Sequence, residues 1–188
     1  LYVELKCGRR DRAELAAEVA RQIRAYGLEH RAVVESFDLA AIAEIKRLDR
    51  EIRTAALFDR KLSRPIPSAR RLAESAIDCG AEEIALHHSL ATRRNIHGAH
   101  ERGLKSVVWT VDGPAWIERA IKKGIHAIIT NQPARMFQRR AQLMKSKNET
   151  MNERKSKSWL QPNPLLDSGF WLLTPAFRSS FPFIYEPA

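Results

Sequence analysis

The chain has 188 residues, of which 44% are hydrophobic and 29% are charged, a composition that excludes a disordered polypeptide and allows one sizeable core. Lys and Arg outnumber Asp and Glu by 32 to 22, and the resulting net charge of +10 favours anionic partners without selecting one class. Residues 138–188 hold 8 of the basic and 4 of the acidic residues, so the last segment carries much of the excess. This uneven distribution argues against nucleic-acid binding by the whole chain.

No apolar run approaches the roughly 20 residues that are required to span a bilayer, and no signal-peptide pattern stands at Leu1. Cys7 and Cys79 lie far apart and match no metal-ligand or redox spacing, which indicates free thiols in a reducing compartment. We therefore expect a cytoplasmic location. Because the chain begins at Leu1 with a strand that carries candidate site residues, we also expect it to be the later part of a longer domain.

Short β-branched apolar runs alternate with longer segments of helical period up to about residue 132. Such alternation is typical of repeated βα units and a parallel sheet. Strands are predicted at 2–6, 32–37, 52–58, 83–87, 106–111 and 127–130. Helices are predicted at 12–26, 39–48, 69–79, 92–102 and 114–123.

Capping residues support these boundaries. Asp11 is a candidate N-cap of the first helix, with Glu14 completing a capping box, and Ser68 precedes the third. A glycine follows four of the helices, at Gly27, Gly80, Gly103 and Gly124. Six parallel units suit either an open doubly wound sheet or most of a barrel. Because no glycine-rich phosphate loop follows a strand, we favour an α/β fold of the TIM-type (β/α)8 barrel kind, incomplete at its amino end.

The repeating pattern stops after Met136, so we divide the chain into a barrel portion, 1–136, and a tail, 137–188. The tail is first charged and then rich in proline and aromatic residues. Proline is incompatible with a helix interior and with an interior strand, so we expect the tail to be poorly ordered. The alternative is that it docks on a partner or an anionic surface.

In a TIM-type barrel the chemistry lies at the carboxyl ends of the strands. Glu4 and Lys6 are two positions apart at the end of the first strand, so they project from the same face. A carboxylate suits a hard divalent cation, and a lysine offers a point charge to a phosphate oxygen. One carboxylate is too few for a metal site, and the further ligands would come from strands that precede Leu1.

Two other strand ends carry candidates. Trp109 suits either an apolar wall for a glycerol-like group or an anchor in the core. His87 and His88 invite a general-base role, but adjacent strand residues point to opposite faces, so at most one faces the site. We expect neither to be catalytic.

Taken in order, Glu4-Leu5-Lys6, Glu35-Ser36-Phe37, Trp109-Thr110-Val111 and the run from Ile128 to Pro133 resemble the glycerophosphodiester phosphodiesterase family over 1–136. The resemblance implies a TIM-type barrel that hydrolyses glycerophosphodiesters to glycerol 3-phosphate and an alcohol, with a divalent metal ion, Mg²⁺ or Ca²⁺, and a histidine pair. It assigns Glu4 to the metal and Lys6 to the phosphate as a catalytic group. Phe37 and Trp109 would form the substrate-binding wall.

The family's His-Arg-Gly opening, its following glutamate, its Glu-x-Asp metal pair and its later His-Asp are absent here. We therefore expect the isolated chain to have negligible activity and to self-associate through an open barrel edge. The alternative function is a non-catalytic binding or regulatory remnant that docks through its basic aromatic tail. A phosphoinositide-cleaving barrel fits the Trp-Thr-Val and Thr-Asn-Gln-Pro segments less well.

Overall fold

The structure is a computed structural model that describes residues 1–60, 67–155 and 171–173, with side chains described up to residue 146. Seven parallel strands form one sheet in chain order: β1 (Tyr2–Glu4), β2 (Val33–Ser36), β3 (Arg53–Phe58), β4 (Glu83–His87), β5 (Lys105–Trp109), β6 (Ala127–Ile129) and β7 (Trp171–Leu173). The helices are α1 (Arg12–Ala25), α2 (Leu39–Leu48), α3 (Ala69–Asp78), α4 (Arg93–His100), α5 (Ala115–Lys123) and α6 (Pro133–Lys155), with a 3₁₀ turn, η1 (His88–Leu90).

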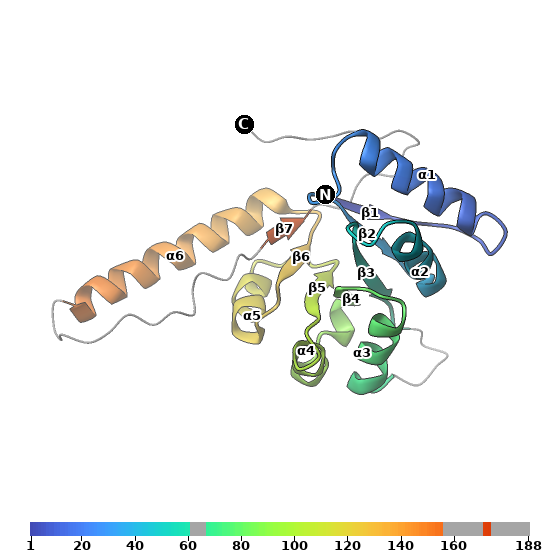
Figure 1. Ribbon diagram of the computed structural model, residues 1–188. Coiled ribbons are helices and arrows are strands. Elements are labelled where there is room, and N and C mark those ends of the chain that lie inside the picture. The colour runs from blue at the N-terminus through green and yellow to red at the C-terminus, as the bar shows by residue number, and fades with distance from the viewer. Residues whose placement is uncertain (61–66, 156–170, 174–188) are drawn as a thin grey trace.

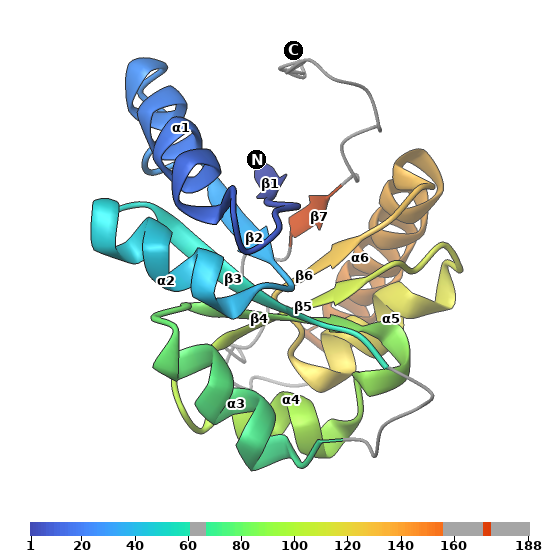
Figure 2. The same ribbon diagram turned by 90° about the vertical axis from the view of Figure 1, so that its right-hand side faces the viewer.

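The sheet is curled, and the helices α1 to α5 lie around its outer side (Figures 1 and 2). The far part of α6 extends away from this body (Figure 1). Strand order that follows the chain, with a helix between successive strands, is the arrangement of a TIM-type barrel. The expected fold class, an incomplete barrel of this type, is confirmed.

Alternation along the strands builds two apolar layers. Side chains on the inner face of the curl form one cluster: Val33, Ala55, Leu57, Ala85, Val107, Ala127 and Ile129. Their neighbours in sequence, such as Val34, Ile84 and Val108, point outward and pack under the helices. Both faces are therefore buried, which explains why the strands read as nearly continuous apolar runs.

The glycine helix stops are confirmed, because all four glycines have positive φ, as at Gly124, where φ is 69° at the C-cap of α5. Ser68 caps α3 as predicted by accepting a hydrogen bond from the Arg71 amide at 3.2 Å. Asp11 occupies the predicted N-cap position of α1, but the capping hydrogen bond expected of it does not form. Its side chain accepts no capping bond from α1 and turns back to the Gly8 amide at 2.7 Å instead, so the tight loop before the helix competes successfully for this carboxylate.

Two elements extend beyond the expected barrel portion. Helix α6 continues through the proposed boundary at Met136 to Lys155, and β7, in the predicted tail, pairs in parallel with β6. Residues 156–170 and 174–188, where the rest of the proposed tail falls, lie outside the described residues. Within the described part, β1 and β7 each pair with one strand, so an open edge is present and self-association through it stays a prediction.

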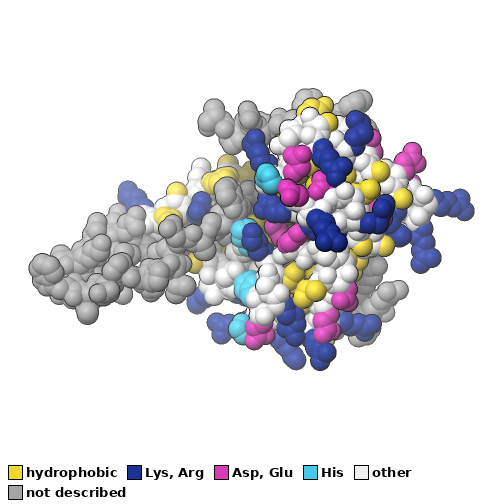
Figure 3. Space-filling model, in the orientation of Figure 1, with side chains coloured by type: hydrophobic (Ala, Val, Ile, Leu, Met, Phe, Trp, Pro, Cys, Tyr) yellow, Lys and Arg dark blue, Asp and Glu magenta, His cyan; other side chains and the backbone are white. Residues whose placement is uncertain are grey.

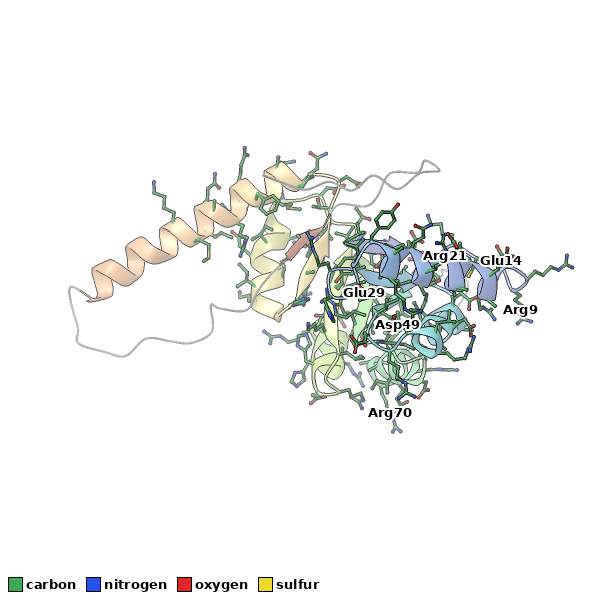
Figure 4. All side chains as sticks on the ribbon, turned by 45° about the horizontal axis from the view of Figure 1, so that its top comes forward. Arg9, Glu14, Arg21, Glu29, Asp49 and Arg70 are labelled. Atoms are coloured by element: carbon green, nitrogen blue, oxygen red, sulfur yellow. The ribbon has the colours of Figure 1, made fainter. Side chains whose placement is uncertain are left out.

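Charged side chains tie the outer helices together. Arg24 of α1 donates to the Asp49 carboxylate after α2 at 2.7 Å, and Asp49 is labelled in Figure 4 with Glu14 and Arg21 on α1.

On the face seen in Figure 3, Lys and Arg side chains lie among Asp and Glu side chains. No helix in the described part of the chain is long and apolar enough to cross a membrane.

Candidate active site

The predicted pair at the end of β1 is present. The Lys6 ammonium lies 3.3 Å from the Glu4 carboxylate, with 65% of the lysine side chain and 31% of the glutamate side chain exposed. A solvated ion pair of this kind adds little to stability. Its significance is that it presents a carboxylate and a cation together beside the mouth of the curl.

The segment Glu35-Ser36-Phe37 places three side chains in three different settings. Ser36 is buried and donates from its hydroxyl to the Leu5 carbonyl at 2.7 Å, which fixes the end of β2 against β1. Phe37 follows the strand and is 49% exposed. The Ser36 hydrogen bond therefore holds the end of β2 in place. The Phe37 ring lies just beyond this end, at the mouth of the curl.

Glu35 is the feature of this segment that sequence reasoning missed. It is 7% exposed, and its Oε2 atom has no hydrogen-bond partner within the described residues. It lies directly across from Glu4 in the β1–β2 register, so both side chains belong to the same face. Burial, followed by the negative charges of Glu4 and Glu83, raises the pKa of Glu35 to about 7.

Trp109, at the end of β5, is anchored on the sheet and contacts a second aromatic ring; its role towards a glycerol-like group stays a prediction. Its indole Nε1 donates to the Ala85 carbonyl at 3.1 Å, which anchors the half-buried ring on β4. Its ring also meets Phe37 edge-on, with centroids 5.5 Å apart and an interplanar angle of 83°. Phe37 and Trp109, distant in sequence, thus form one aromatic wall.

The prediction that His87 and His88 point to opposite faces was wrong. Strand β4 ends at His87 and the chain turns into η1 at His88, so strand alternation no longer applies. The two rings lie 4.0 Å apart, and His87 also meets Trp109 edge-on at 5.1 Å. His87 therefore extends the aromatic wall.

Hydrogen bonds with Ser89 orient the His87 ring through its Nδ1 atom. The Ser89 amide donates to Nδ1 at 3.4 Å, and the Ser89 hydroxyl lies 2.8 Å from the same atom. Burial, followed by the charge of His88, lowers the pKa of His87, while Asp59 at 3.9 Å opposes that shift. A neutral imidazole whose Nδ1 accepts carries its proton on Nε2.

Asp112 holds the two loops that follow β5 and β6. Its Oδ1 atom accepts from the Asn131 amide at 2.7 Å and from the Thr130 hydroxyl at 3.0 Å, and its Oδ2 accepts from the Asn131 side chain at 3.1 Å. These bonds order the mouth beside Trp109. Thr130 and Asn131, which belong to the run from Ile128 to Pro133, therefore have a structural role.

The carboxylates of this chain fit part of a site for a divalent metal ion. Within the described side chains, no group of three or more His, Cys, Asp and Glu converges as a metal site. Glu4 and Glu35 nevertheless offer carboxylate oxygens from paired positions, and one Glu35 oxygen is unpartnered among these residues. Oxygen donors suit a hard cation, which takes six or more of them, so this chain fits part of such a site.

Residues 4–135 match the model of the Glycerophosphoryl diester phosphodiesterase family. The chain belongs to this family. Its members are phosphoric diester hydrolases, and the resemblance inferred from the sequence motifs is confirmed.

Individual relatives support the same family assignment. The glycerophosphodiester phosphodiesterase of Caldanaerobacter subterraneus subsp. tengcongensis is 26% identical over 133 residues, which are 70% of this chain and 51% of that protein. A structure of a family protein from Silicibacter pomeroyi has 27% identity and a TM-score of 0.67, over 76% of this chain and 50% of that one. The chain thus spans about half the length of these relatives.

An Oleispira antarctica phosphodiesterase, solved in complex with the product sn-glycerol-3-phosphate, shares the fold with 18% identity and a TM-score of 0.64. That alignment covers 74% of this chain and 54% of the Oleispira chain. The family fold therefore includes the half-barrel seen here.

Proposed function

We propose that this chain forms part of the site of a phosphodiesterase that hydrolyses glycerophosphodiesters to glycerol 3-phosphate and an alcohol. The observation that carries the proposal is the aromatic wall of Phe37 and Trp109 at the same mouth as the Glu4–Lys6 pair. An apolar wall suits the carbon chain of glycerol, and the ammonium suits a phosphate oxygen. The Oleispira complex with glycerol 3-phosphate supports this class of substrate.

In this proposal Lys6 is the catalytic residue that this chain supplies. Its ammonium contacts the phosphate and stabilises negative charge that develops on the phosphoryl oxygens. Glu4 would hold a divalent metal ion, Mg²⁺ or Ca²⁺, with Glu35 beside it. Such an ion, when bound, polarises the phosphoryl group. Phe37 and Trp109 orient the glycerol carbons and exclude water from that side.

We further propose that the isolated polypeptide has negligible turnover. The chain spans about half the length of the family proteins that it matches, and a cation needs more oxygen ligands than its described residues bring together.

The free thiols of Cys7 and Cys79 support the predicted reducing, cytoplasmic compartment. The remnant alternative depends on a tail that lies mostly outside the described residues.

Binding of the product tests the assignment of Lys6 and Trp109. Titration of the chain with glycerol 3-phosphate is expected to shift the Trp109 indole signal in ¹H–¹⁵N spectra, and Lys6→Ala is expected to weaken binding about fivefold through the loss of one solvated charge contact. The matched control is Arg70→Ala, because Arg70 is an exposed cation on α3, paired with Glu74 (Figure 4). A Trp109 signal that does not move, or an equal loss in both variants, would contradict the assignment.

A further inference from the structure

A second group of side chains continues from the aromatic wall towards α5. The His88 ring, 4.0 Å from His87, also meets the Trp116 ring edge-on at 6.3 Å. Ring contacts therefore run without interruption from the mouth of the curl to the first turn of α5. We call this set the aromatic strip: Phe37, Trp109, His87, His88 and Trp116.

Cations gather at the Trp116 end of the strip. The Arg119 guanidinium carbon lies 5.4 Å from the Trp116 ring centre, and the Lys123 ammonium lies 5.9 Å from it. These residues are three and seven positions after Trp116, so they share one face of α5. Both cation–π contacts hold the charges beside the indole.

Arg93, at the start of α4, is the third cation of this cluster. The Lys123 side chain reaches the loop just before α4, where its ammonium donates to the Ala91 carbonyl. Burial, followed by the charges of Arg119 and Arg93, lowers the pKa of the Lys123 ammonium. We call Arg93, Arg119 and Lys123 the cation cluster.

The cation cluster lacks a counter-charge among the described residues. No ion pair there joins any of its three members to a carboxylate, and Glu118, the acidic residue of α5, pairs with Arg139 of α6. Arg21 and Arg47, on α1 and α2, differ in this respect, because each has a carboxylate partner on its own helix. Three neighbouring like charges repel one another, so an anion placed among them is favourable.

We propose that the aromatic strip and the cation cluster form a subsite for a second anionic group of the substrate, so that the preferred glycerophosphodiesters carry an additional phosphate. The inference rests on the proposed function, because it places the phosphodiester at Lys6 and its glycerol at Phe37 and Trp109. The remaining body of the substrate lies along the strip. Its second phosphate meets Arg119 and Lys123, where a quaternary ammonium group would be repelled.

The test compares two ligands that differ by one phosphate: glycerophosphoinositol and glycerophosphoinositol 4-phosphate. Each is titrated into the full chain, and the indole signals, assigned with Trp109→Phe and Trp116→Phe, are followed. We expect the 4-phosphate to bind at least about fivefold more tightly and to shift the Trp116 signal, since two cations contact the added group. The double variant R119A/K123A is expected to remove most of that difference.

The control is R21A/R47A. It also removes two positive charges, but from the outer surfaces of α1 and α2. It is expected to keep the preference, and circular dichroism checks that both variants fold. Equal affinity for the two inositol ligands would overturn this inference and leave the proposed function standing. A shift of Trp116 by inorganic phosphate as large as that by the 4-phosphate would also overturn it, because the site would then recognise a free anion. Binding of neither ligand would contradict the proposed function as well.

Discussion

Replacing Glu35 with Gln is expected to raise the free energy of unfolding at pH 8 by up to about 3 kcal/mol and to change it little at pH 4.5. The pKa of Glu35 is about 7 in the folded chain, against an ordinary value of 4.5. Between these values the folded chain keeps the proton that the unfolded chain releases. The free energy of unfolding of the wild-type chain therefore falls as the pH rises from 4.5 through about 7. The glutamine variant has no proton to release at this position, so its free energy of unfolding does not fall for this reason.

Urea denaturation at pH 4.5, 6 and 8 measures the effect. Glu14→Gln is the control, because Glu14 lies exposed in the first turn of α1 (Figure 4) and its substitution is expected to change stability by less than about 0.5 kcal/mol. Buried Glu83 adds its own pH dependence, since burial raises its pKa too, but that contribution is common to both chains. If the difference in free energy of unfolding between Glu35→Gln and the wild-type chain does not grow from pH 4.5 to pH 8, Glu35 is not held protonated by burial.

Trp109→Ala is expected to lower the free energy of unfolding by about 3 kcal/mol, whereas Trp109→Phe costs about 1 kcal/mol. The alanine variant loses the ring contacts with Phe37 and His87 and leaves a cavity on β5. The phenylalanine variant keeps a ring and loses the hydrogen bond to the Ala85 carbonyl. The same urea denaturation, at pH 7, separates the two contributions.

The two variants also divide the binding role of Trp109 from its structural role. Trp109→Phe retains an apolar surface, so binding of glycerol 3-phosphate is expected to weaken much less than in Trp109→Ala. Equal costs in both variants, for stability and for binding, would show that the aromatic wall contributes nothing beyond its hydrogen bond.

Much of the fold could be predicted from the sequence because local and long-range preferences agree there. The apolar runs are buried on both faces and the glycines after the helices all adopt the left-handed conformation, so strands β1 to β6 and helices α1 to α5 lie close to their predicted positions. The Glu4–Lys6 pair was predictable for the same reason. Although β1 ends at Glu4, the Leu5 amide still donates to the Glu35 carbonyl at 2.7 Å, so the alternation of side chains continues to Lys6.

The misses have specific physical causes. Strand β7 depends on pairing between Trp171–Leu173 and β6, whose paired residues, such as Ala127 with Trp171, lie 44 positions earlier in the chain, and no local pattern encodes such a partner. Helix α6 continues past Met136 without an apolar period, and its first half is instead rich in good helix formers. His88 was misplaced because the strand stops one residue earlier than alternation assumes.

Burial of Glu35 could not be read from the sequence at all. A glutamate within an apolar strand is compatible with an edge position or with solvent, and only the curl of the sheet brings it inside beside Glu4 and Glu83. The same holds for the cation cluster, because Arg93 and Lys123 come from different helices that the βα repeat brings together.

The decisive measurement is release of glycerol 3-phosphate from glycerophosphoinositol by the purified chain, with Mg²⁺, with Ca²⁺ and with a chelator. We expect no release above the chelator background, since the described residues supply only part of a metal site, while product binding at Trp109 is retained. Metal-dependent release that disappears in Glu4→Ala would contradict it, because the half-barrel would then contain a complete site.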